Sequence, residues 1–226
     1  MKKEIYDRLE GYMLSCMADS AHDREHVYRV LYTALDLAQG EPDVDRDVLI
    51  AACLLHDIGR QAQFRDPGLC HARVGAQMAV SHLLEEGFSD DFAKRVGHCI
   101  ETHRFRKNNP PLTPEAKLLF DADKLDVTGA MGVARTLLYQ GQLARPLYTL
   151  TETGEVCDGT GECSDSFFRE YKFKLEHIYD RFYTPRGAQE AVKRKAAAEA
   201  FYDSLLREVR CSRKGSAVLE ENLLGD

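Results

Sequence analysis

Residues Val48–Arg60 read VLIAACLLHDIGR and are the most informative segment of this chain. Its first eight residues, Val48 to Leu55, are all apolar and predict a buried helix. The run ends in an imidazole and a carboxylate side by side, His56 and Asp57. Because burying an unpartnered charge is costly, Asp57 is expected to be paired, hydrogen-bonded or bound to a metal. The adjacent His56 supplies a second ligand of a kind that divalent transition metals accept.

Composition indicates an ordinary globular protein. The chain has 226 residues, 44% of them hydrophobic and 30% charged, which suits one domain or one domain with an appendage. The formal net charge of -7 provides no overall basic field, so we expect neither a nucleic-acid polymer nor a membrane as partner. The N-terminal residues lack an apolar signal region and no apolar run approaches membrane length, so we expect a cytoplasmic protein.

The seven cysteines are odd in number and scattered, without a CxxC pair. This usage favours reduced thiols in the cytosol over a disulfide framework or a structural zinc site. Cys157 and Cys163 flank a glycine-rich loop, and a cross-link between them is the alternative that the sequence leaves open.

Hydrophobic residues recur with a helical period almost throughout, so the fold class expected is all-α. Local signals mark several ends: Ser20 and Ser89 as N-caps, Pro114 in a first turn, and Gly59 as a C-terminal breaker. The predicted helices cover residues 2–17, 20–38, 45–56, 71–86, 89–103, 114–127, 130–140, 166–183 and 186–210.

These helices are expected to form a single domain over residues 1–211. Its chemistry-bearing motifs lie within residues 20–135, and its C-terminal helices within 166–210. Glycine and proline punctuate residues 141–165, which predicts an excursion or flexible lid. Residues 212–226 are expected to be a flexible tail.

Two further segments carry side chains that could complete a site with His56 and Asp57. His22 and His26 lie one helical turn apart and therefore share a face, which Arg29 extends. On its own, a histidine pair at this spacing most often lies on the protein surface and takes no part in a site. Asp123 could be an exposed carboxylate. Its helix is apolar on more than one side, however, so a carboxylate packed there would need a partner that compensates for its burial.

The ordered set of His26, His56–Asp57 and Asp123 resembles the metal motif of the HD-domain phosphohydrolases, an all-helical superfamily. The strings that carry the resemblance are AHDREHVYRV at 21–30, ACLLHDIGR at 52–60 and DADKLD at 121–126. An HD dipeptide alone is a weak signal, whereas three strings in the right order are a strong one. The resemblance implies a single-domain helical bundle of the HD type.

The resemblance also implies that His26, His56, Asp57 and Asp123 bind one divalent metal ion. Mixed imidazole and carboxylate ligands suit Mn, Fe, Co, Ni or Zn, and Mg is a further candidate. The ion would lower the pKa of a bound water, which attacks phosphorus, and would polarise the phosphoryl group. Asp57 and Lys124 are the predicted catalytic residues.

Basic side chains near these ligands are expected to bind the substrate phosphate. Arg29 and Arg60 could grip phosphate through two donors each, and Lys124 would act as a point charge. The alternatives are an ion pair of Arg29 with Asp36 or Glu25, and a solvated Lys124.

Three more residues have predicted roles around the site. His71 and His103 occupy positions that bind the substrate phosphate or a second metal in other branches of the superfamily. We place both in the substrate-binding set, with helix capping as the alternative. Asp126 could orient Lys124 or a ligand histidine from outside the metal shell.

Together these features predict a metal-dependent phosphohydrolase that acts on a small phosphorylated metabolite, with a nucleotide as the leading candidate. One alternative is a diiron oxygenase, which would need His71 and His103 as extra ligands. The other is a non-catalytic module that binds a phosphorylated ligand. The sequence leaves open the scissile bond, the native metal and the oligomeric state, a homodimer included.

Overall fold

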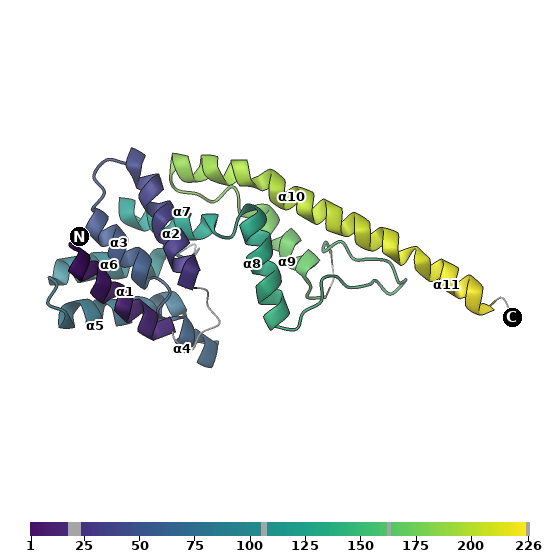
Figure 1. Ribbon diagram of the computed structural model, residues 1–226, viewed down its shortest axis with the longest axis horizontal. Coiled ribbons are helices and arrows are strands. Elements are labelled where there is room, and N and C mark those ends of the chain that lie inside the picture. The colour runs from purple at the N-terminus through teal and green to yellow at the C-terminus, as the bar shows by residue number, and fades with distance from the viewer. Residues whose placement is uncertain (18–23, 105–107, 162–163, 225–226) are drawn as a thin grey trace. The chain divides into compact units, whose positions relative to one another are not determined.

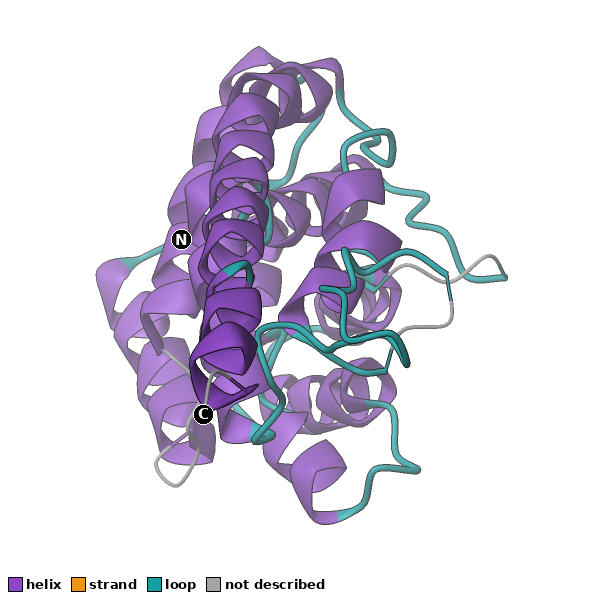
Figure 2. Ribbon diagram, turned by 90° about the vertical axis from the view of Figure 1, so that its right-hand side faces the viewer, coloured by secondary structure: helices purple, strands orange, loops and turns teal. Residues whose placement is uncertain are grey.

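The computed structural model describes residues 1–17, 24–104, 108–161 and 164–224, and their regular elements are helical (Figures 1 and 2). The all-α prediction is therefore confirmed. Ser20 and His22 lie outside the described residues. The helices, including two short 3-10 turns (η), are α1 (Lys3–Met17), α2 (Arg24–Leu37), η1 (Ala38–Gly40), α3 (Arg46–Leu55), α4 (Arg60–Arg65), α5 (His71–Glu85), α6 (Asp90–Thr102), α7 (Pro114–Leu125), α8 (Gly129–Gln142), α9 (Phe167–Phe173), η2 (Leu175–His177), α10 (Pro185–Arg213) and α11 (Gly215–Leu224).

Chain contacts divide the molecule into two compact units. Unit 1 comprises Met1–Asp126 and Phe182–Ala188, and unit 2 comprises Val127–Arg181 and Gln189–Asp226. The single domain over residues 1–211 stays a prediction. Within the described residues, every helix is too short or too polar to cross a membrane.

Unit 1 is built around α3, which packs against α1, α2, α6 and α7. The apolar run explains this position, because Val48, Leu49 and every residue from Ala51 to Leu55 are fully buried. Burial of a leucine or valine side chain contributes about 1.5–3 kcal/mol, so α3 is a major source of stability. The Asp45 side chain starts this helix by accepting hydrogen bonds from the amides of Asp47 and Val48.

Gly59 has a different role from the one expected. Its φ of -82° is right-handed, so it does not end a helix by adopting a left-handed conformation. Instead, a Cβ on Gly59 would lie 2.3 Å from the carbonyl oxygen of His71 and 2.6 Å from the amide nitrogen of Gly75. The glycine lets the backbone after α3 touch the start of α5, and this contact brings His71 close to Asp57.

Other boundaries follow their signals, with three differences. Ser89 accepts a hydrogen bond from the Phe92 amide, and Pro114 lies in the first turn of α7. Helix α4 was not expected, because RQAQFR has no apolar stripe. The helix predicted over 166–183 breaks at Lys174, whose φ and ψ of -128° and -59° are not helical. Because the apolar spacing continues past Lys174, the sequence does not reveal this break.

The third difference is α11, which occupies most of the expected tail. Its Val218, Leu219 and Leu223 side chains are all more than half exposed, so α11 is not held by a core of its own. Flexibility of residues 212–226 stays a prediction.

Unit 2 has an aromatic core and contains the 141–165 excursion. Tyr171 and Tyr202 stack with ring centroids 4.2 Å apart, and Phe168 packs on Tyr202. Gly159 has a positive φ of 92°, and a Cβ there would lie 2.2 Å from the Phe168 carbonyl oxygen, so the excursion packs tightly on α9. That it acts as a lid stays a prediction. The cysteines within the described residues are free thiols, and Cys163 lies outside them.

A buried carboxylate joins the two chain segments of unit 1. Asp121 on α7 is fully buried and accepts hydrogen bonds from the amides of Tyr183 and Thr184, at 2.8 and 2.7 Å. The Thr184 hydroxyl donates a third bond, at 2.7 Å. Asp121 therefore fixes the segment that leads into α10 against α7.

Replacing Asp121 with alanine should lower the free energy of unfolding by about 2–4 kcal/mol, because it leaves buried amides without acceptors. Urea denaturation of the purified variant would measure the loss. Asp203→Ala, at an exposed position of α10, is the matched control and should change stability by less than about 0.5 kcal/mol. Equal stability of the two variants would contradict the anchoring role.

Candidate metal centre

Six ionisable side chains from separate parts of unit 1 meet in its interior. They come from α2, the residues after α3, the start of α5, the end of α6, and α7. The five innermost are at most 3% exposed, although four of them are imidazoles and one is a carboxylate. The six side chains are His26, His56, Asp57, His71, His103 and Asp123.

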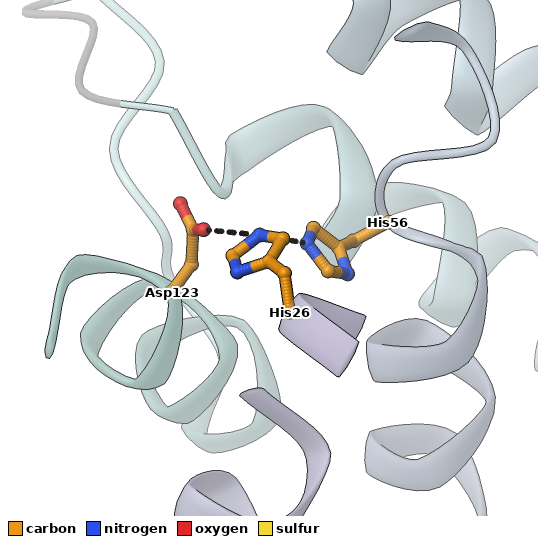
Figure 3. Close-up of side chains that lie close together, drawn as sticks. All are labelled: His26, His56 and Asp123. Atoms are coloured by element: carbon orange, nitrogen blue, oxygen red, sulfur yellow. Dashed lines mark hydrogen bonds and ion pairs between the residues drawn. The ribbon is translucent and has the colours of Figure 1, made fainter. Parts of the chain in front are cut away.

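Four of them, the predicted metal ligands, form the first group. His26 Nε2 lies 3.3 Å from His56 Nε2 and 3.3 Å from Asp123 Oδ1 (Figure 3). Asp57 Oδ2 completes the group at 3.6 Å from His26 Nε2 and 3.7 Å from His56 Nε2. The ligand atoms of His26, His56 and Asp123 all lie within 4.8 Å of one another, which is close enough to hold one ion.

The other oxygen of Asp57 faces a second group. Oδ1 lies 3.6 Å from His71 Nε2 and 3.8 Å from His103 Nε2. The two imidazole nitrogens are 3.3 Å apart. These three ligand atoms could also hold an ion, so the Asp57 carboxylate stands between two potential metal positions.

Hydrogen bonds on the far side of each imidazole determine which nitrogen faces the centre. All four Nδ1 atoms lie against an oxygen acceptor, so a neutral ring carries its proton there and presents the Nε2 lone pair inward. Inward-facing lone pairs beside two carboxylates form a donor set that suits a divalent transition metal. The acceptors are Asp126 Oδ2 for His26 (2.7 Å), the Cys53 carbonyl for His56 (2.7 Å), Gln63 Oε1 for His71 (2.6 Å) and the Ile100 carbonyl for His103 (2.6 Å).

Burial keeps three of these rings neutral near pH 7. It lowers the pKa of His103 to about 4. Burial together with the Arg60 charge lowers the pKa of His71 to about 2. The pKa of His56 is also lowered by burial. Neutral imidazoles are the form that binds metal.

His26 is the exception in the metal-free protein. Burial opposes its protonation, but hydrogen bonds to Asp123 and Asp126 more than offset this and raise its pKa to about 9. Burial would likewise raise the pKa of Asp57, yet the Arg60 guanidinium and the imidazoles hold it well below its usual range. Asp123 behaves in the same way, with its pKa lowered mainly by His26. A proton on His26 thus occupies the place of a metal cation.

The predicted phosphate-binding cations lie at different distances from this centre. Arg60 Nε donates to Asp57 Oδ1 at 2.9 Å, so Arg60 is part of it. Arg29 donates to Asp126. Asp36, which the sequence offered as an ion-pair partner of Arg29, pairs with Arg186 instead. The Lys124 ammonium lies 5.0 Å from the centroid of the Phe120 ring. The catalytic and substrate-binding roles of Lys124 stay predictions.

Two neighbours of the centre were missed in the sequence. Gln63 holds His71, but it lies on α4, which has no apolar pattern to reveal it. Arg104 follows His103, lies 3.7 Å from Cys70 Sγ through Nη1, and adds positive charge near His71. Lys124 and a predicted ligand histidine were the two partners expected for Asp126, and the structure places Asp126 against His26.

Comparisons with known proteins match the sequence to a family. The HD-domain family matches residues 24–128, which include all six side chains. The uncharacterized protein YpgQ of Bacillus subtilis (strain 168) is 30% identical over 148 residues, covering 63% of this chain and 69% of that protein.

Solved structures agree. An HD-superfamily hydrolase from Bacillus thuringiensis is 28% identical, with a TM-score of 0.68, over 92% of this chain and 98% of that one. Bacillus subtilis YpgQ in complex with ADP shares the fold at 24% identity, with a TM-score of 0.68, over 90% of this chain and 97% of that one. The chain therefore belongs to the HD-domain superfamily of hydrolases.

Proposed function

We propose that this protein is a metal-dependent phosphohydrolase that acts on a small phosphorylated metabolite, with a nucleotide as the leading candidate. The observation that carries the proposal is the convergence of imidazole lone pairs on the buried Asp57 carboxylate, with Arg60 beside it. Binding of ADP by the related YpgQ supports a nucleotide substrate.

The donor set fits a divalent ion held by His26, His56, Asp57 and Asp123. A bound ion supplies Lewis acidity toward phosphate oxygens and lowers the pKa of water. Arg60 contributes a fixed positive charge at the edge of the ligand set, where a phosphate oxygen would bring negative charge. The Arg60 guanidinium and the imidazoles hold the pKa of Asp57 well below its usual range, so the role proposed for Asp57 is to present an ionised carboxylate to the ion.

Asp123→Asn should reduce kcat/KM for the preferred nucleotide by at least about 100-fold, since the ion supplies several kcal/mol of transition-state stabilisation. His56→Ala should do the same. His177→Ala, an exposed position in unit 2, is the matched control and should keep wild-type activity. The assay is release of phosphate or pyrophosphate from a panel of nucleoside mono-, di- and triphosphates with Mn²⁺.

Turnover that survives both ligand substitutions in folded protein would contradict the metal-dependent mechanism. Tight nucleotide binding by the wild type without turnover, under several metals, would favour the non-catalytic binding module instead.

Metal binding should depend on pH through His26. Its pKa of about 9 means that the metal-free protein carries a proton there at pH 7.5, which the ion must displace. We expect release of about one proton per ion, and an affinity that rises about tenfold per pH unit between about pH 6.5 and 8.5. Calorimetry in buffers of different ionisation enthalpy would count the protons, and a count of zero would contradict a protonated His26.

The same raised pKa contributes to the stability of the metal-free protein. Because the folded-state pKa lies above the ordinary histidine value of 6.5, this contribution is fully present below about pH 6.5 and is lost as the pH rises through about 9.

A second candidate function rests on the group formed by Asp57 Oδ1, His71 and His103. Asp57, His71 and His103 could hold a second ion, and two ions would suit either two-metal hydrolysis or a diiron oxygenase. Arg60 opposes a second cation, because it already donates to Asp57 Oδ1. We therefore expect metal analysis of the loaded protein to give about one ion per chain, unchanged in His103→Ala. Two irons per chain, with an oxygen-dependent product, would favour the oxygenase.

A further inference from the structure

A buried carboxylate lies behind His26, on the side of the ring opposite the candidate metal position. Asp126 follows the last residue of α7 and is 6% exposed. Its Oδ2 accepts from His26 Nδ1 at 2.7 Å, while His26 Nε2 faces Asp123 at 3.3 Å. Asp126 therefore determines which way the imidazole turns and, when the ring is neutral, which nitrogen carries its proton.

Arg29 holds Asp126 in this position. It lies three residues after His26 on α2, so the two side chains share a face. Its Nε donates to Asp126 Oδ1 at 2.7 Å and its Nη2 to Oδ2 at 3.1 Å. A planar guanidinium that binds a carboxylate through two parallel bonds fixes the carboxylate plane, which a lysine cannot do.

This arrangement distinguishes His26 from the other three imidazoles. Their Nδ1 atoms lie against neutral oxygens, the Cys53 and Ile100 carbonyls and the Gln63 amide. A carboxylate behind a ligand imidazole makes the ring a stronger electron donor and fixes its orientation. Arg29 moderates this effect, because it also neutralises part of the Asp126 charge.

We propose that Arg29 and Asp126 are positioning residues that act on the metal through His26, and that Arg29 does not bind the substrate phosphate. The proposal rests on the proposed metal centre but not on the identity of the substrate. It reassigns Arg29, which the sequence alone placed among the phosphate-binding cations.

The test measures Mn²⁺ affinity and substrate kinetics separately. The variants are Arg29→Ala, Arg29→Lys and Asp126→Asn, each checked for its melting temperature. Titration calorimetry on chelator-treated protein should give Mn²⁺ dissociation constants about 10–100-fold higher for Arg29→Ala and Asp126→Asn, with Arg29→Lys intermediate. At saturating Mn²⁺, the KM for the nucleotide should stay within about threefold of the wild-type value.

Arg95→Ala is the matched control. Arg95 pairs with Asp45 at 2.9 Å, within the same unit but outside the centre, so its loss should leave Mn²⁺ affinity unchanged. Nitrogen-15 NMR of the metal-free protein provides a structural readout, because the His26 ring signals should shift in Asp126→Asn and stay in place in Arg95→Ala.

A Mn²⁺ dissociation constant for Arg29→Ala within fivefold of the wild-type value would overturn the positioning role. A KM raised by more than about tenfold at saturating Mn²⁺ would overturn the claim that Arg29 does not bind the substrate phosphate. A fivefold or larger increase in the dissociation constant, with KM within about threefold, supports the proposal. If Arg29→Ala fails to fold, Arg29→Lys and Asp126→Asn decide by the same limit. Absence of hydrolysis for every nucleotide would refute the proposed substrate class, while the affinity and NMR measurements would still decide the role of Arg29.

Discussion

The Asp57 carboxylate, only 2% exposed, lies within 3.8 Å of four buried imidazoles and so joins the two halves of the candidate metal centre. Its two oxygens face different pairs of histidines, and Arg60 adds a charge at one of them. Such a concentration of polar groups would be costly without compensation. Hydrogen bonds on the outer side of every ring offset part of the cost of burial, and the proposed ion would offset the remainder.

The fold places these groups by packing helices around α3. The second half of this helix, Ala51 to Leu55, is fully buried, so the two residues that follow it, His56 and Asp57, lie in the interior. The close backbone contact at Gly59 then brings the start of α5 alongside, which adds His71. An apolar helix thus leads directly into the polar centre of unit 1.

How well the sequence predicted each feature depended on how far apart in the chain the interacting residues lie. The helices around the site were predictable, because their caps and apolar periods are local, and the family motif gave the proposed ligands. The contact between Asp126 and His26 was harder to predict, because it joins residues 100 positions apart. For Arg29, a position on the ligand face could not distinguish a phosphate from a buried carboxylate as its partner. The contact of Gln63 with His71 could not be predicted, because α4 is short and has no apolar pattern that marks it as a helix.

If His26, His56, Asp57 and Asp123 bind one metal ion, anomalous diffraction from crystals of the Mn²⁺-loaded protein will locate that ion. We expect a strong peak within bonding distance of His26 Nε2, His56 Nε2, Asp57 Oδ2 and an Asp123 oxygen. A map without a peak among these four side chains, from protein shown to be folded and saturated with Mn²⁺, would contradict this assignment.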